Sequence, residues 1–173
     1  MQDAPAVDER YITATNTSNL KISQDRPGAA DVLIAAGWSA SRLGAALMRL
    51  HSEFDGAARA SSETDARLMA GKLKSLPTVV DQLMIQAVKW GINPAQVLPS
   101  VCWWLDKNCR MCEGRKFERL PEAPVLSAKQ CTSCRGTGQI YLPGGDDARR
   151  ITHYMDDCVN RARDSIKKRL RHD

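Results

Sequence analysis

The sequence lacks the features that mark membrane proteins and secreted proteins. No stretch of its 173 residues approaches the ~20 consecutive apolar residues that a membrane-spanning helix needs. Its first ten residues, MQDAPAVDER, have no apolar core of the kind found in secretory signal peptides. We therefore expect a cytoplasmic protein that has no membrane partner.

Groups that carry out catalysis are also scarce. The chain has three histidines, His51, His153 and His172, which are isolated from one another in the sequence. It contains no G-x-S-x-G motif, no H-E-x-x-H motif and no phosphate-binding loop. These absences favour a protein that is not an enzyme.

Alternating apolar and polar runs are almost absent, and aromatic residues make up only 5% of the chain. Both observations disfavour an extensive β-sheet, whereas the helix formers Ala, Leu, Arg and Met are abundant. A hydrophobic content of 43% is enough for one core. The predicted fold class is therefore mainly α, a helical bundle.

Apolar residues recur at helical spacing in several regions, including one where Ser61 or Ser62 can cap a helix. Two other regions bear most on the fold. In the first, Asp31 can cap a helix that runs to about Phe54, with Gly37 and Gly44 marking a break or a close helix contact. In the second, a helix that begins at Asp146 or Asp147 has an apolar side. Its members are Ile151, Met155, Cys158, Val159, Ala162, Ile166 and Leu170.

Two C-x-x-C pairs, Cys109 with Cys112 and Cys131 with Cys134, are separated by eighteen residues. Zinc in structural sites is tetrahedral, and two such pairs supply a shell of four thiolates. Glycines follow the pairs where a bending chain needs positive φ, although Lys116 replaces the second glycine after the first pair. We predict one zinc ion per chain, which folds an insert too poor in apolar residues to fold alone.

Three other interpretations of the cysteines fit the sequence less well. Disulfides are disfavoured in a reducing compartment, and a thioredoxin-type centre needs one pair beside a βαβ pattern. A catalytic zinc needs an open position, which four thiolates would close. Cys102, in the apolar helix before the first pair, is expected to be a buried thiol and not a fifth ligand.

Four parts follow from these patterns: a flexible N-terminal segment, a helical body, the zinc-binding insert, and a C-terminal basic amphipathic helix that packs on the body. In order, they cover residues 1–28, 29–107, 108–140 and 141–173.

Positive charge is concentrated in the last two parts. The formal net charge is +5; residues 1–100 carry ten basic and ten acidic side chains, whereas residues 101–173 carry fifteen and ten. Such an excess is typical of proteins that bind nucleic acid, with a solvated basic face as the equal alternative.

Three polar side chains, Arg149, Arg150 and His153, lie at the start of the C-terminal helix. Cations oppose the helix dipole there, and the first turns of a recognition helix are the part that reaches base edges. We predict that these three residues contact duplex DNA and that Arg115 and Lys116 of the insert contact its phosphates.

The order of the parts resembles the phage lambda Q-type late transcription antiterminators. The similarity covers roughly residues 30–165: DVLIAAGWSASRLGAALM in a helical half, an apolar helix feeding CRMCEGRK, a loop, CTSCRGTG and a capped helix. Members of that family have C-x-x-C-x-G-x-G pairs in this order, with the zinc insert between the helices of a helix-turn-helix. The resemblance implies that arrangement here, with Lys116 as a departure from the pattern.

What the resemblance implies about function is transcription antitermination. Such a factor binds double-stranded DNA near a promoter, loads onto paused bacterial RNA polymerase with its sigma factor, and suppresses terminators by obstructing the RNA exit path. Nascent RNA at the exit channel is a further partner, and phage late or lysis genes are the targets. Because the factor travels with polymerase it needs a second surface, which we place at exposed residues among Trp38, Arg42 and Arg49.

Two alternatives share parts of this pattern. A zinc-containing DNA-binding activator or repressor of transcription initiation has the same sequence features. The cysteine-rich domain of DnaJ-type chaperones also uses C-x-x-C-x-G-x-G, but with four repeats and two zinc ions. A terminator placed between promoter and reporter separates antitermination from control of initiation.

Overall fold

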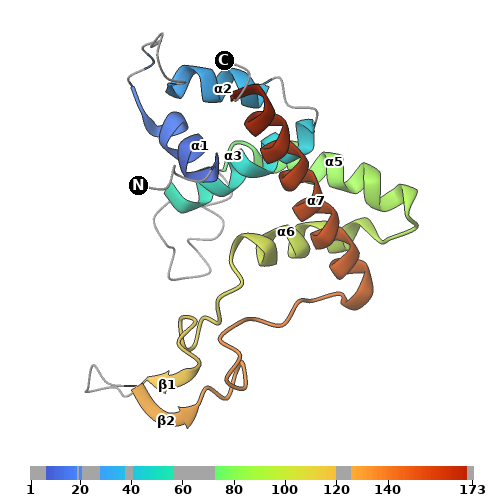
Figure 1. Ribbon diagram of the computed structural model, residues 1–173. Helices are drawn as coiled ribbons and strands as arrows, with labels where there is room; N and C mark the ends of the chain where they lie inside the picture. Colours follow the sequence, from blue (N-terminus) through green and yellow to red (C-terminus); the bar gives the residue numbers. More distant parts are fainter. Residues whose placement is uncertain are drawn as a thin grey trace. The chain divides into compact units, whose positions relative to one another are not determined.

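The structure is a computed structural model that describes residues 7–18, 20, 28–37, 41–56, 73–119 and 126–170. It is mainly helical with a small two-stranded sheet, in agreement with the predicted class (Figure 1). The chain forms two compact units, Met1–Gln86 with His153–Asp173, and Ala87–Thr152. No helix in the described part of the chain combines the length and the apolar content that crossing a membrane requires.

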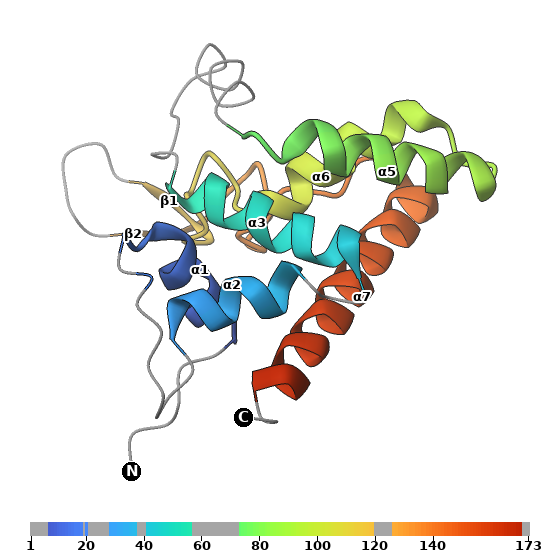
Figure 2. The same ribbon diagram turned by 90° about the horizontal axis from the view of Figure 1, so that it is seen from above.

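The first unit is built from helices. It contains α1 (Val7–Asn16), α2 (Ala29–Gly37), α3 (Arg42–Gly56), most of α5 (Leu76–Lys89) and the larger part of α7 (Gly145–Leu170). Helix α1 packs on α2, and both contact α3, which can be followed in Figure 2. The helix predicted to begin near Ser61 lies outside the described residues.

The N-terminal segment differs from the sequence-based expectation. Residues 1–28 are predicted to be flexible, but Val7–Asn16 forms a helix that buries Val7, Tyr11 and Ala14. These three residues recur at spacings of four and three, which places them on one helical face. The stripe is narrow and is interrupted by polar residues, so composition alone conceals it.

Both glycines in the predicted helix from Asp31 have structural roles. Helix α2 ends at Gly37, and α3 begins at Arg42. On α3 the backbone of Gly44 lies so close to α7 that an added Cβ would be 2.0 Å from the carbonyl oxygen of Cys158. The absent side chain therefore lets the two helices touch through their backbones.

Apolar faces and polar contacts between helices hold this unit together. The predicted apolar side of α7 is buried along most of its length, and Leu43, Leu47 and Leu50 of α3 are buried too. Glu53 of α3 accepts hydrogen bonds of 2.9 Å from both the backbone N–H and the hydroxyl of Ser75. This contact satisfies a free donor at the start of α5 and ties that helix to α3.

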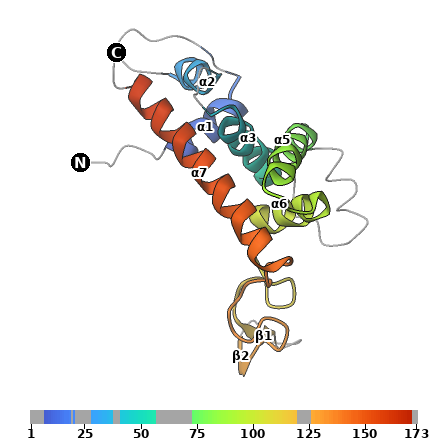
Figure 3. The same cartoon turned by 90° about the vertical axis from the view of Figure 1, so that its right-hand side faces the viewer.

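The second unit contains α6 (Val97–Leu105), β1 (Phe117–Arg119) and β2 (Leu126–Gln130). The Asn93 side chain accepts a hydrogen bond of 2.9 Å from the N–H of Ala95, so Asn93 and Pro94 start a short 3-10 helix, Pro94–Gln96, before α6. The two strands are antiparallel. Figure 3 shows them in the segment that joins the end of α6 to the start of α7.

Candidate metal centre

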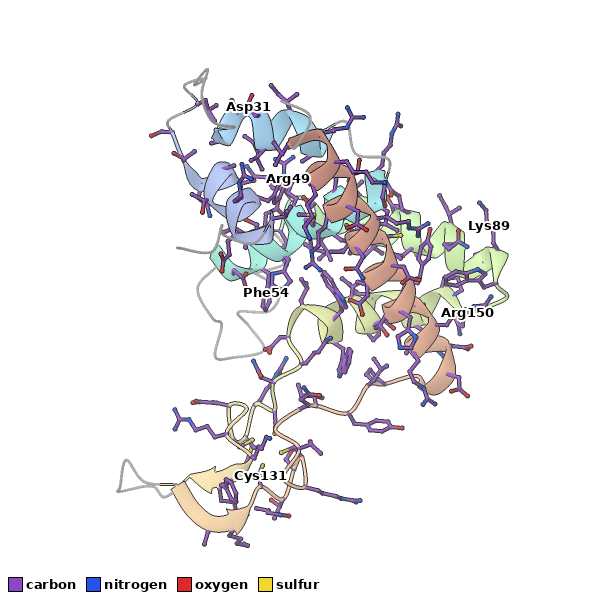
Figure 4. All side chains as sticks on the ribbon, viewed as in Figure 1. Asp31, Arg49, Phe54, Lys89, Cys131 and Arg150 are labelled. Carbon is purple, nitrogen blue, oxygen red and sulfur yellow. The ribbon has the colours of Figure 1, made fainter. Side chains whose placement is uncertain are left out.

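The four cysteines of the two pairs meet in one buried cluster. Their Sγ atoms all lie within 4.8 Å of one another, with 3.9 Å between Cys109 and Cys131 and 3.6 Å between Cys112 and Cys134. Figure 4 shows the sulfur atoms gathered near Cys131. Sulfurs at the corners of a tetrahedron, each about 2.3 Å from a central ion, are about 3.8 Å apart, whereas disulfide sulfurs are about 2.05 Å apart. The cluster therefore fits a metal ion and contains no disulfide.

Two turns with the same backbone conformation present these thiols. We call Cys109–Lys116 the first knuckle and Cys131–Gly138 the second knuckle. In each, the residue after the second cysteine, the glycine that follows it, and the last residue have positive φ. The φ values are 52°, 80° and 73° in the first knuckle and 51°, 79° and 78° in the second. The chain thus folds the same motif twice.

Reciprocal hydrogen bonds join the two knuckles. The backbone N–H of Cys109 donates to the carbonyl oxygen of Gly138 over 2.9 Å, and that of Cys131 donates to the carbonyl oxygen of Lys116 over 2.9 Å. Each knuckle thereby fixes the first thiol of the other. This pairing relates the knuckles by an approximate twofold axis, and it explains why residues far apart in sequence deliver all four sulfurs to one point.

Lys116 and Gly138 occupy equivalent positions but have different steric freedom. A Cβ on Gly138 would lie only 2.7 Å from the carbonyl oxygen of Gly114, so that position requires glycine. Lys116 accommodates a side chain at φ 73°, a conformation that costs a non-glycine residue about 1–2 kcal/mol. The departure from the glycine pattern therefore leaves the turn intact.

The environment of the cluster shifts the pKa values of Cys112 and Cys134 in opposite directions. Burial raises the pKa of Cys134, but the N–H of Gly138, 3.2 Å from its sulfur, and the neighbouring thiols outweigh burial and lower this pKa to about 6. Burial and the hydrogen bonds with the other thiols raise the pKa of Cys112 to about 11. Metal ligation requires thiolates, and the N–H donated to Cys134 stabilises that form.

Cys102 lies outside this cluster and is exposed, which corrects the prediction of a buried thiol. The buried residues of α6 are Val97, Ser100 and Val101, at the spacing of one helical face. Cys102 is one residue further on, about 100° around the helix, and so points away from that face.

The predicted DNA-contacting residues at the start of α7 are exposed, but two of them have protein partners. Arg149 forms an ion pair with Asp146. The Arg150 guanidinium lies 4.6 Å from the centroid of the Trp90 ring. His153 is exposed. In the first knuckle, Arg115 is 3.2 Å from Glu113, while Lys116 is exposed.

The predicted partner-binding residues are described only in part. Arg42 is exposed, and Arg49 is exposed and lies 3.5 Å from Glu53. Trp38 is outside the described residues.

Sequence reasoning missed the contact between Trp90 and Arg150 and the exposed position of Tyr141. The two partners of the first feature are sixty residues apart, and no local pattern connects them. Tyr141 is 86% exposed, and the turn-forming Pro-Gly-Gly that closes QIYLPGG is the local signal for a surface position.

No protein-family model, curated protein or solved structure matches this chain.

Proposed function

We propose that this protein is a transcription antitermination factor of the lambda Q type. The observation that carries the proposal is the position of the four-cysteine cluster in the segment between α6 and α7. That is the place of the zinc insert in the family that the sequence resembles. In this proposal α6 and α7 are the two helices of the interrupted helix-turn-helix, and the factor acts in the cytoplasm by binding, without catalysis.

The proposed metal is one zinc ion per chain, held by Cys109, Cys112, Cys131 and Cys134. Four thiolates are a zinc donor set, and they leave no position for a reactive water, so the metal has a structural role. Zinc binding contributes about 10–16 kcal/mol in small zinc-dependent modules. That free energy offsets the entropy of ordering an insert whose described part buries little besides the cysteines.

The proposed DNA contacts come from the exposed start of α7. Arg149 leaves Asp146 to reach a base edge, and because this pair is at the surface its loss costs about 0–1 kcal/mol. Arg150 and His153 complete the base-contacting set, and Arg115 and Lys116 contact phosphates. Arg42 and Arg49, together with Trp38, form the proposed surface for RNA polymerase carrying its sigma factor.

Transcription with purified bacterial RNA polymerase tests the proposal. Two templates share one promoter with its flanking DNA, and only one of them carries a terminator before the end of the transcript. We expect the protein to increase readthrough of the terminator and to leave the yield from the second template unchanged. A changed yield from both templates with constant readthrough would instead identify an activator or repressor of initiation.

A further inference from the structure

An exposed aromatic side chain stands where the chain leaves the second knuckle. Tyr141 is 86% exposed, more than any other large apolar side chain in the described part of the protein, and the adjacent Ile140 is 37% exposed. A tyrosine in water contributes little hydrophobic free energy to folding. An aromatic face held in this way is available to a partner.

The backbone beside Tyr141 is held firmly. The N–H of Ile140 donates to the carbonyl oxygen of Lys107 over 2.9 Å, and the indole N–H of Trp103 donates to the carbonyl oxygen of Ile140 over 2.8 Å. Because these bonds fix the preceding residue, little chain entropy is lost when a partner contacts the tyrosine ring.

Two lysines lie near the backbone that leads to Tyr141. The Lys107 ammonium lies 5.0 Å from the centroid of the Trp103 ring, and Lys116 lies against Gly138, two residues before Ile140. Neither lysine forms an ion pair with any residue that the structure describes, whereas Arg115 and Lys129 pair with Glu113 and Glu118. From Trp103 to Tyr141 the sequence has seven basic and four acidic residues. We call Trp103, Lys107, Lys116, Ile140 and Tyr141 the stem patch.

We infer that the stem patch binds single-stranded RNA. An exposed aromatic ring in a segment that also carries lysines without an ion pair to any described residue can stack one base while the lysines neutralise neighbouring phosphates. A duplex offers no such partner, because its bases already stack on their neighbours within the helix. The RNA is a nascent transcript, and in this respect alone the inference rests on the proposed function.

Binding of fluorescein-labelled oligonucleotides, followed by anisotropy, tests the inference without polymerase. The probes are an unstructured 12-nucleotide RNA, the DNA strand of the same sequence, and the corresponding DNA duplex. We expect Tyr141→Ala to weaken RNA binding about 10-fold and to leave duplex binding unchanged. Tyr141→Phe, which keeps the ring, should bind RNA like the wild type. Zinc content of each variant is measured first, to confirm that the insert is folded.

The lysines give a second test that does not change the aromatic ring. Lys107→Gln should reduce the slope of log affinity against log salt by about 0.7 for RNA, and Lys116→Gln should do the same. RNA affinity unchanged in Tyr141→Ala, or equal losses in the alanine and phenylalanine variants, would overturn the inference. Tighter binding of the DNA strand than of the RNA would overturn the choice of RNA.

Failure of this inference can be told apart from failure of the proposed function. If Tyr141→Ala loses affinity for RNA polymerase and keeps its affinity for RNA, the stem patch is a protein-docking surface and the inference is wrong. If the wild type binds RNA through Tyr141 but gives no readthrough, the inference holds and antitermination does not.

Discussion

The N–H of Cys109 donates a 2.9 Å hydrogen bond to the carbonyl oxygen of Gly138, so the first ligand of one knuckle is fixed by the last residue of the other. The Cys131 N–H repeats this contact with Lys116. The four thiols consequently form one cooperative unit, and changes at the two equivalent last residues should differ in effect.

Gly138→Ala should weaken zinc binding by at least about 10-fold. Its Cβ would lie 2.7 Å from the carbonyl oxygen of Gly114, at a φ of 78° that costs a non-glycine residue about 1–2 kcal/mol. Lys116→Gly is the matched control. It relieves backbone strain but gives the unfolded chain more freedom, so zinc affinity should stay within about threefold. Competition with a chromophoric chelator measures both, and equal losses would contradict the knuckle geometry.

A second pair of glycines tests the contact between α3 and α7. Gly44→Ala should lower the free energy of unfolding by about 3 kcal/mol or more, because the new Cβ would lie 2.0 Å from the Cys158 carbonyl oxygen, which is backbone and cannot rotate away. Gly37→Ala is the control, since an added Cβ there meets nothing within 4 Å. Urea unfolding followed by circular dichroism provides the comparison. A stable Gly44→Ala variant would show that the helices do not approach this closely.

The two arginines at the start of α7 should have different roles in DNA binding. If Arg149 reads a base, Arg149→Ala costs about 1–3 kcal/mol and relaxes specificity at one position. Arg150→Ala should in addition lower stability by about 0.5–1 kcal/mol, because it removes the contact with the Trp90 ring. Gel-shift titrations on site variants measure the first effect, and thermal unfolding measures the second. Unchanged DNA affinity in the double variant would remove α7 from the DNA interface.

DNA binding and antitermination should be separable. Alanine substitutions at Arg42 and Arg49, both exposed on α3, should abolish terminator readthrough while gel-shift affinity for the DNA site is retained. Arg49 also pairs with Glu53, so the free energy of unfolding of the Arg49 variant is measured to account for loss of that ion pair. Parallel loss of readthrough and DNA affinity would contradict a separate polymerase surface.

Local patterns predicted much of the fold and the cysteine cluster. The ligands were identifiable because each C-x-x-C turn sets its own geometry, and the apolar side of α7 because helical periodicity is local. Tertiary contacts between residues far apart in the sequence could not be identified in this way. Nothing in the sequence joins Trp90 to Arg150, and the two-knuckle symmetry depends on hydrogen bonds between residues 15 and 29 positions apart.

The composition of a segment also does not predict which of its residues are buried. A polar stretch with three spaced apolar residues predicts a flexible segment, yet α1 buries Val7, Tyr11 and Ala14 against the rest of its unit. The exposure of Cys102 could not be predicted in the same way. The apolar composition of α6 indicates that much of the helix is buried, but it does not indicate which face is buried.

We propose that one zinc ion, held by four thiolates, folds the insert between α6 and α7. Mass spectrometry under native conditions, on protein purified without chelator, tests it most directly. We expect a mass excess of one zinc per chain that disappears under denaturing conditions and is missing from Cys131→Ser. A chain that carries no metal, or two zinc ions, would contradict it.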